Sequence, residues 1–113
     1  MADVLGNFEQ AVLLALLHPN SDLGKQGYGR AVLKEVQLRL DRDVSAGAVY
    51  STLSRLEAKG LIRSEVREGT QARGGLPKRF YALTEAGIQA LDEAAQMVTR
   101  LWSGVRIPLR SAR

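Results

Sequence analysis

The 113-residue sequence contains no cysteine and a single histidine, His18. Without cysteine the chain forms no disulfide, carries no thiolate nucleophile and builds no cysteine-ligated zinc site. One histidine is too few for a histidine-based metal site or a catalytic triad within one chain. We therefore expect no metal and no other cofactor.

Long apolar runs are also missing. No segment approaches the roughly 20 apolar residues in succession that a membrane-spanning helix needs. The first ten residues, MADVLGNFEQ, carry acidic side chains where a signal peptide would have its basic end. Apolar residues make up 45% of the chain and charged residues 25%, as in ordinary folded domains. We expect a cytoplasmic protein with no membrane partner.

The sequence also lacks a recognisable catalytic pattern. Asp92 and Glu93 are adjacent in a helical segment and therefore point in different directions. His18 has no evident partner, and Gly74-Gly75 is not followed by the helix and Lys-Ser/Thr pair of a phosphate-binding loop. We expect no enzymatic activity.

Positive charge is concentrated in the middle of the chain. The net charge is +4, and residues 45–83 hold seven Lys/Arg against three Asp/Glu. Residues 1–44 hold five against six, and residues 84–113 hold four against three. A local basic excess of this kind is typical of proteins that bind a polyanion.

Apolar residues at helical spacing predict three helices in the first half of the chain. The first covers residues 5–18 and ends before Pro19, and the second starts near Gly27 and ends near Leu40. The third follows Ser45, a good N-cap because its hydroxyl can accept from a free backbone N–H, and ends at Gly60.

After Gly60 the apolar period changes. Residues 61–67 and 78–83 read as two strands joined by a polar, glycine-rich loop, which predicts a hairpin. Thr84 then caps a fourth helix that continues to Trp102. Three helices, a hairpin and a further helix is the order of a winged helix-turn-helix domain with an added C-terminal helix.

Four blocks of sequence are similar to a known family. LGNFEQAVLLALL, YGRAVLKEV, GAVYSTLSRLEAKGLI and KRFYALTEAG, in this order, resemble the PadR family of bacterial transcriptional regulators over residues 4–102. The resemblance implies a mainly α fold, with a DNA-binding winged helix-turn-helix at 4–83 and a dimerisation helix at 84–103. We expect a basic, mobile tail at 104–113.

The third helix has a small and polar outer face. Small side chains allow close approach to the major groove, and hydroxyl or guanidinium groups can bind base edges or phosphates. The predicted DNA contacts here are Ser45, Gly47, Tyr50, Ser51, Ser54 and Arg55. The alternative is that Ser45 is only a cap and that this face is solvated or packs against a partner protein.

The predicted hairpin carries basic residues in or beside its loop, namely Arg73, Lys78 and Arg79. A basic hairpin can follow the phosphate backbone or enter the minor groove, and each neutralised phosphate steepens the salt dependence of binding. The alternative is an ordinary charged hairpin in solvent.

The fourth helix has apolar residues at steps of three and four, which is the pattern of a coiled-coil seam. The seam consists of Ile88, Leu91, Ala95, Val98 and Trp102. We expect a second copy to cover it, although Ile88 and Leu91 can in part fold back on their own core. As the family's dimers imply, Leu5, Phe8 and Val12 of the first helix pack against the partner's fourth helix.

Trp102 is the single tryptophan. Some members of the family bind flat aromatic effectors between subunits, so a small aromatic effector could contact Trp102 and Phe8. The alternative is that Trp102 is only a packing residue.

These features predict a homodimeric, sequence-specific transcriptional regulator, a repressor relieved by an effector or by stress. Two-fold symmetry predicts double-stranded DNA with a palindromic operator, its half-sites roughly 34 Å apart. The competing hypothesis is a winged-helix protein interaction module without specific DNA binding.

Overall fold

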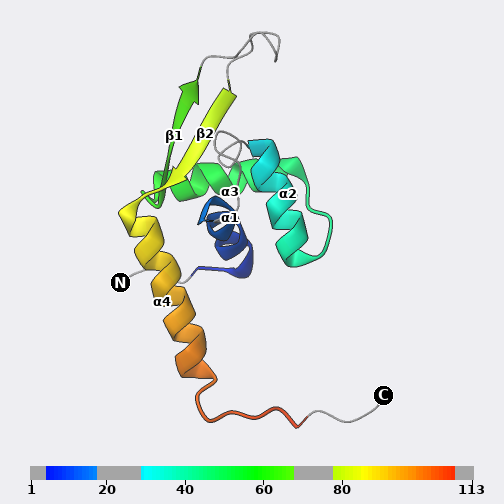
Figure 1. The fold of residues 1–113 in the computed structure, drawn as a ribbon, viewed down its shortest axis with the longest axis vertical. Helices are drawn as coiled ribbons and strands as arrows, with labels where there is room; N and C mark the ends of the chain where they lie inside the picture. The colour runs from blue at the N-terminus through cyan, green and yellow to red at the C-terminus, as the bar shows by residue number, and fades with distance from the viewer. Residues whose placement is uncertain (1–4, 18–28, 68–77, 109–113) are drawn as a thin grey trace.

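The computed structural model describes residues 5–17, 29–67 and 78–108. Within these ranges it contains α1 (Asn7–Leu17), α2 (Gly29–Leu40), α3 (Ala46–Ala58), β1 (Ile62–Arg67), β2 (Lys78–Leu83) and α4 (Glu85–Leu101). The order and type of the elements confirm the predicted mainly α, winged-helix fold (Figure 1). Arg73, His18, Gly74 and Gly75, which entered the sequence interpretation, lie outside the described residues.

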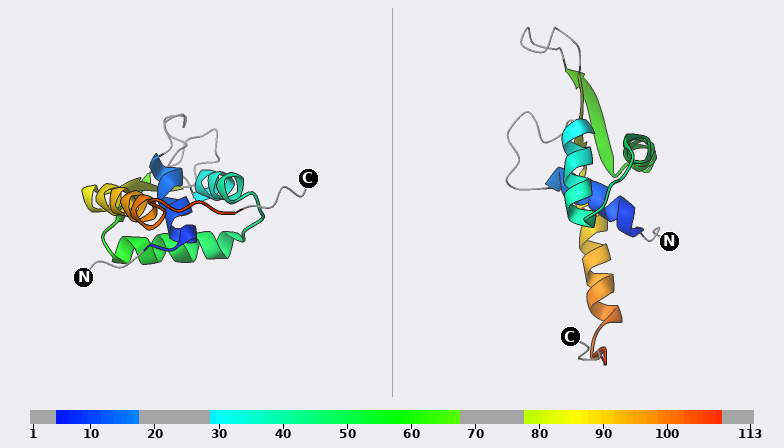
Figure 2. Two further views of the ribbon diagram at one scale, coloured as in Figure 1. Left: turned by 90° about the horizontal axis from the view of Figure 1, so that it is seen from below. Right: turned by 90° about the vertical axis from the view of Figure 1, so that its right-hand side faces the viewer.

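The core lies where α1, α2 and α3 meet. Apolar side chains spaced three and four apart turn inward on each helix, because burying one stripe removes apolar surface from water. The fully buried side chains are Val12, Leu13, Val32, Val36, Val49, Leu53, Leu56 and Ile62. Figure 2 shows α1 running between the other elements, with α3 along one side of the molecule.

One expectation about α1 is corrected by this packing. Val12 was predicted as a dimer contact, but it is 0% exposed and belongs to the core of its own chain. A side chain without exposed surface offers nothing to a partner. Phe8 is half-buried against the same core, and Leu5 is 7% exposed.

A glycine C-cap fixes the direction in which the chain leaves α3. Gly60 has φ +80°, and the amides of Gly60 and Leu61 donate to the carbonyls of Glu57 and Leu56 at 2.9 and 3.0 Å. This is a Schellman motif, which needs the left-handed conformation that glycine adopts without a steric penalty. The chain thereby turns directly into β1.

The same junction anchors the start of α4. The Thr84 hydroxyl accepts from the Gly87 amide at 3.1 Å, as predicted for an N-cap, and donates to the Gly60 carbonyl at 2.7 Å. Gly87 is buried against the Leu61 carbonyl, where a Cβ would collide with the backbone. The first turn of α4 is therefore held against the end of α3.

Beyond this junction α4 extends away from the three-helix core (Figure 1). Ala90, Leu91 and Ala94 still pack against the core, whereas Val98 and Leu101 are 49% and 66% exposed. Residues 104–108 are exposed and form no helix or strand. Among the described helices, none has the length and hydropathy of a membrane span.

Candidate nucleic-acid interface

The outer face of α3 is uncovered. Ser45, Gly47, Tyr50, Ser51, Ser54 and Arg55 are all exposed, whereas Val49, Leu53 and Leu56 on the inner face have no exposed surface. Ser45 is the N-cap, and its hydroxyl accepts from the Ala48 amide at 3.0 Å. In Figure 2, α3 lies at the edge of the molecule. The structure thus gathers these six residues on one accessible surface.

The hairpin of β1 and β2 stands beside α3 and projects beyond it (Figure 1). The strands pair antiparallel, with Ser64 opposite Tyr81 and Val66 opposite Arg79. Alternation of side chains along a strand therefore puts Ser64, Tyr81 and Arg79 on one face of the hairpin. Hydrogen bonding between Ser64 and Glu57 shows that this face is turned toward α3.

Arg79 and Lys78 are both exposed on β2, and Lys78, opposite Arg67 in the register, lies on the other face of the hairpin from Arg79. One guanidinium nitrogen of Arg79, Nη1, donates to the Ser64 hydroxyl at 2.9 Å. The position of Arg79 on the same face as Ser64 places its charge between the hairpin and α3. Sequence reasoning identified Arg79 and missed its partner, because strand register depends on pairing across the loop.

Arg67 has a different environment from Arg79. Its guanidinium lies 3.9 Å from the centroid of the Phe80 ring, and its Nε is 3.4 Å from the Glu65 carboxylate. These three residues share the opposite face of the hairpin from Ser64 and Arg79. Arg67 therefore stabilises the hairpin locally.

Tyr50 is 43% exposed, and the rest of its side chain packs on α2. Its ring and hydroxyl occupy the space that a Cβ on Gly29 would fill. Gly29, the first residue of α2, is buried under this ring. Sequence reasoning missed Gly29, since only the fold brings the two helices together. Tyr50 is thus both a surface residue and a helix-packing residue.

Arg55 is partly directed toward α1. Its Nη2 donates to the Thr52 hydroxyl at 3.4 Å, and its Nε is 3.9 Å from the Glu9 carboxylate. The side chain of Arg55 remains 56% exposed. The Arg55 guanidinium therefore lies near Glu9 of α1 and is still accessible on the α3 surface.

Glu9 connects α1 with the C-terminal end of α3. Its carboxylate, 13% exposed, accepts from Lys59 Nζ at 3.2 Å and from the Gly6 amide at 3.1 Å. Burial by itself raises the pKa of Glu9, but the Gly6 hydrogen bond, Lys59 and Arg55 together hold it below the ordinary value of 4.5. The carboxylate is therefore ionised at neutral pH.

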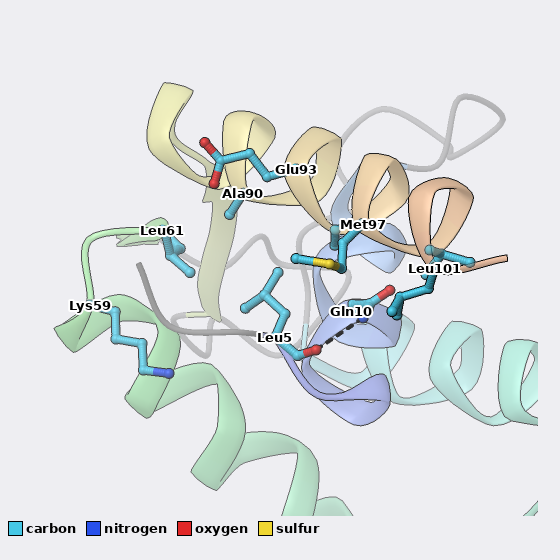
Figure 3. Close-up of a pocket in the computed structure, with 10 residues that line it drawn as sticks. Leu5, Gln10, Lys59, Leu61, Ala90, Glu93, Met97 and Leu101 are labelled. Carbon is cyan, nitrogen blue, oxygen red and sulfur yellow. Dashed lines mark hydrogen bonds between the residues drawn. The ribbon is translucent and has the colours of Figure 1, made fainter. Parts of the chain in front are cut away.

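A groove lies on the other side of Lys59, between the N-terminal end of α1, the end of α3 and α4 (Figure 3). Its volume is about 560 Å³, and it is lined by Leu5, Gln10, Lys59, Leu61, Ala90, Glu93, Ala94, Met97, Val98 and Leu101. The Gln10 side-chain amide donates to the Leu5 carbonyl at 3.0 Å. The lining is mostly apolar, with Glu93 on one wall.

The face of α4 that lines the groove differs in part from the seam predicted for dimerisation. Of the residues predicted for dimerisation, only Leu5 and Val98 line it. Leu91 is half-buried, and Ile88, Ala95 and Trp102 are exposed elsewhere on the helix. Sequence reasoning missed Ala90, Ala94, Met97 and Leu101, which repeat at the same helical spacing but shifted by one residue. The spacing alone could not choose between the two stripes.

No three of the His, Cys, Asp and Glu residues in the described ranges lie together as metal ligands would.

Comparison with known proteins gives consistent matches. Residues 16–93 match the transcriptional regulator PadR-like family. The chain is 37% identical over 91 residues to the transcriptional regulator Rv3488 of Mycobacterium tuberculosis, covering 80% of this chain and 78% of that protein. A PadR-like transcription factor from Bacteroides fragilis has a TM-score of 0.68 at 27% identity, covering 86% of this chain and 84% of that one. A PadR family regulator from Eggerthella lenta has a TM-score of 0.61 at 28% identity, with 83% and 76% covered.

Proposed function

This chain belongs to the PadR-like family of transcriptional regulators, and we propose that it is a homodimeric, sequence-specific DNA-binding repressor. The observation that supports this most is the exposed, small and polar face of α3 beside a basic hairpin. Residues 4–83 form the DNA-binding domain, residues 84–103 the dimerisation helix and residues 104–113 a basic tail. A repressor acts where the DNA is, so we place it in the cytoplasm.

In this proposal α3 lies in the major groove. Gly47, Ser51 and Ser54 allow close approach, and the two serines offer hydroxyls to base edges, while Tyr50 and Arg55 contact the sides of the groove. Ser45 and the free N–H groups at the start of α3 are suited to a phosphate. Lys78 and Arg79 contact the backbone, and we assign the same role to Arg73, which lies outside the described residues.

We propose that a second copy covers the groove and the exposed apolar face of α4. Met97, Val98, Leu101 and Trp102 are between 40% and 66% exposed, on a helix that extends past its own core. Contiguous apolar surface of this kind is typical of an interface. Leu5 and α4 supply this interface, with Ile88, Leu91 and Ala95 at its edges. Two copies related by a two-fold axis then bind a palindromic operator.

We further propose that a small aromatic effector binds between the subunits, beside Trp102, and releases the operator. Phe8 on α1 packs against the core of its own chain. Trp102, at the end of α4, is exposed, and its ring is therefore the more accessible of the two predicted effector contacts. An effector changes DNA affinity only as far as it binds the two arrangements of the dimer differently.

The test is a salt titration of binding to duplexes taken from the neighbourhood of the gene. Neutralised phosphates release counterions, so log Kd should rise steeply and linearly with log salt concentration for a preferred duplex. A winged-helix protein interaction module would bind no duplex specifically. Absence of duplex binding at low salt would refute the repressor proposal.

A further inference from the structure

Three side chains form a continuous hydrogen-bonded chain between the hairpin and α3. Arg79 Nη1 on β2 donates to the Ser64 hydroxyl on β1 at 2.9 Å. The same hydroxyl lies 2.7 Å from Oε2 of Glu57 on α3. Glu57 is seven residues before Ser64, and Arg79 is fifteen after it. The contact therefore exists only in the folded domain.

The direction of each hydrogen bond in this chain is determined by the groups. A guanidinium can only donate, and an ionised carboxylate can only accept. The Ser64 hydroxyl has one hydrogen, which goes to Glu57, so its lone pairs are directed at Arg79. Without an acceptor at position 57 the hydroxyl could rotate, and its lone pairs would no longer be fixed toward Arg79.

Tyr81 closes one side of this cluster. It lies opposite Ser64 in the sheet, on the same face of the hairpin as Ser64 and Arg79. Burial raises the pKa of Tyr81, with the Arg79 guanidinium acting in the opposite direction. The Tyr81 hydroxyl is therefore protonated and uncharged at neutral pH.

The cluster is too exposed to contribute much to folding, since surface hydrogen bonds and ion pairs stabilise proteins little. Instead, the cluster restricts the conformation of the Arg79 side chain. A long side chain loses rotamer freedom when it binds a phosphate, and one that is already held loses less. Only one guanidinium nitrogen is used by Ser64, which leaves other N–H donors for a ligand.

We propose that Glu57 is a positioning residue for DNA binding: through the Ser64 hydroxyl it holds the Arg79 guanidinium between the β1–β2 hairpin and α3, where it can bind a phosphate. This proposal rests on the DNA-binding function proposed above. It accounts for an acidic side chain at the edge of a surface where its charge alone would repel DNA.

Two substitutions at position 57 separate positioning from charge. Glu57→Gln and Glu57→Ala both remove the negative charge, but only glutamine keeps an oxygen that can accept from Ser64. Glu57→Gln should bind duplex DNA at least as tightly as the unaltered chain. Glu57→Ala should bind about fivefold more weakly than Glu57→Gln, because one ordering hydrogen bond is lost. Equal affinities of the two variants would overturn the proposal.

Glu57→Gln and Glu57→Ala combined with Arg79→Ala complete a double-mutant cycle. With the guanidinium gone, the difference between alanine and glutamine at position 57 should vanish. A difference that persists would show that Glu57 acts independently of Arg79 and would overturn the proposal. Thermal unfolding of all variants, with similar midpoints expected, verifies that the affinities are compared between folded proteins.

Glu65 offers a matched control, because it is an exposed carboxylate on the other face of β1, beside Arg67. Glu65→Gln and Glu65→Ala should have equal affinities for DNA. If the unaltered chain bound no duplex, both the DNA-binding function and the role of Glu57 would fail. If it bound, and the Glu57 variants were equal, only the role of Glu57 would fail.

Discussion

Tyr50 lies both at the contact between α2 and α3 and on the proposed DNA surface. Its ring covers Gly29 while its side chain remains 43% exposed. A loss of DNA binding in Tyr50→Ala would therefore have two explanations, because the substitution removes a packing contact together with the hydroxyl. The single residue can be understood only by separating these two parts.

Tyr50→Phe makes that separation. The ring keeps its contact with Gly29 and only the packing of the hydroxyl oxygen is lost, so the midpoint of thermal unfolding should fall far less than in Tyr50→Ala. If the hydroxyl reads a base, affinity for the operator should fall about tenfold while affinity for unrelated duplexes is unchanged. Fluorescence anisotropy with both duplexes measures the two affinities. If Tyr50→Phe bound the operator as tightly as the unaltered chain, the Tyr50 hydroxyl would not contact a base.

Glu9 predicts a pH dependence of stability. Its native pKa lies below the ordinary value of 4.5, so its ionised form stabilises the fold at neutral pH, and this contribution disappears as the pH falls through the native pKa. Glu9→Gln should lower the free energy of unfolding by about 1–2 kcal/mol at neutral pH. In urea titrations the gap between the two proteins should shrink below about pH 4.5.

The matched control for Glu9 is Asp43→Asn, which removes an exposed carboxylate from the turn after α2. It should leave the free energy of unfolding nearly unchanged at neutral pH. A gap between Glu9→Gln and the unaltered chain that grew at acidic pH would contradict the assignment.

At the scale of elements, one junction sets the directions of α3, the β1–β2 hairpin and α4 together. Gly60 turns the chain into β1, and Thr84 and Gly87 attach α4 to the same turn. A change in the angle of α4 would therefore be transmitted to α3 through backbone contacts rather than through a flexible linker.

Gly87→Ala tests how tightly this junction is packed. The added Cβ would collide with the Leu61 carbonyl and press on the Leu83 side chain, which lies 3.2 Å away. The backbone must shift, so we expect a loss of about 1–3 kcal/mol in the free energy of unfolding. Gly47→Ala is the control, because its Cβ would have space, with Ser45 Oγ 4.0 Å away. It should stabilise α3 by about 0.5 kcal/mol. If both substitutions changed the free energy of unfolding equally, the backbone at the junction would accommodate the added Cβ without a penalty.

At the scale of the whole molecule, the extended α4 divides the protein into a body, built from the other elements, and an arm with an apolar face. The principal extents of 57 × 40 × 25 Å are those of an elongated chain. A single copy leaves Met97, Val98 and Leu101 in contact with water. A second copy would bury these residues and would set the spacing of two α3 helices along the DNA.

Val98→Glu tests this arrangement. Val98 is 49% exposed in the single chain, so glutamate there should leave the monomer folded. In a dimer two like charges would be buried together, which is strongly unfavourable. Sedimentation should show a monomer, with operator affinity at least about tenfold weaker. An intact dimer would place the interface elsewhere.

Gln96→Glu is the matched control for the dimer test. It adds the same charge about 200° around α4 from Val98, on an exposed position that donates to Asp92 at 2.7 Å. It should sediment as the unaltered chain does. A monomer here would indicate a general effect of charge on α4.

The sequence by itself determined the features that depend on neighbouring residues. Helical periodicity, the hydroxyl caps at Ser45 and Thr84 and the glycine stop at Gly60 act over a few residues, so the helices, the strands and the exposed face of α3 could be predicted. The winged-helix order followed from their succession, because short connections leave few ways to pack them.

Only the tertiary structure decided which distant side chains meet. The ring of Tyr50 on Gly29, Glu9 beside Lys59, the chain from Arg79 through Ser64 to Glu57 and the stripe of α4 that faces Leu5 all join separate elements. Such contacts depend on strand register and on the rotation of each helix about its axis. A shift of one residue changes both while leaving the local pattern nearly the same.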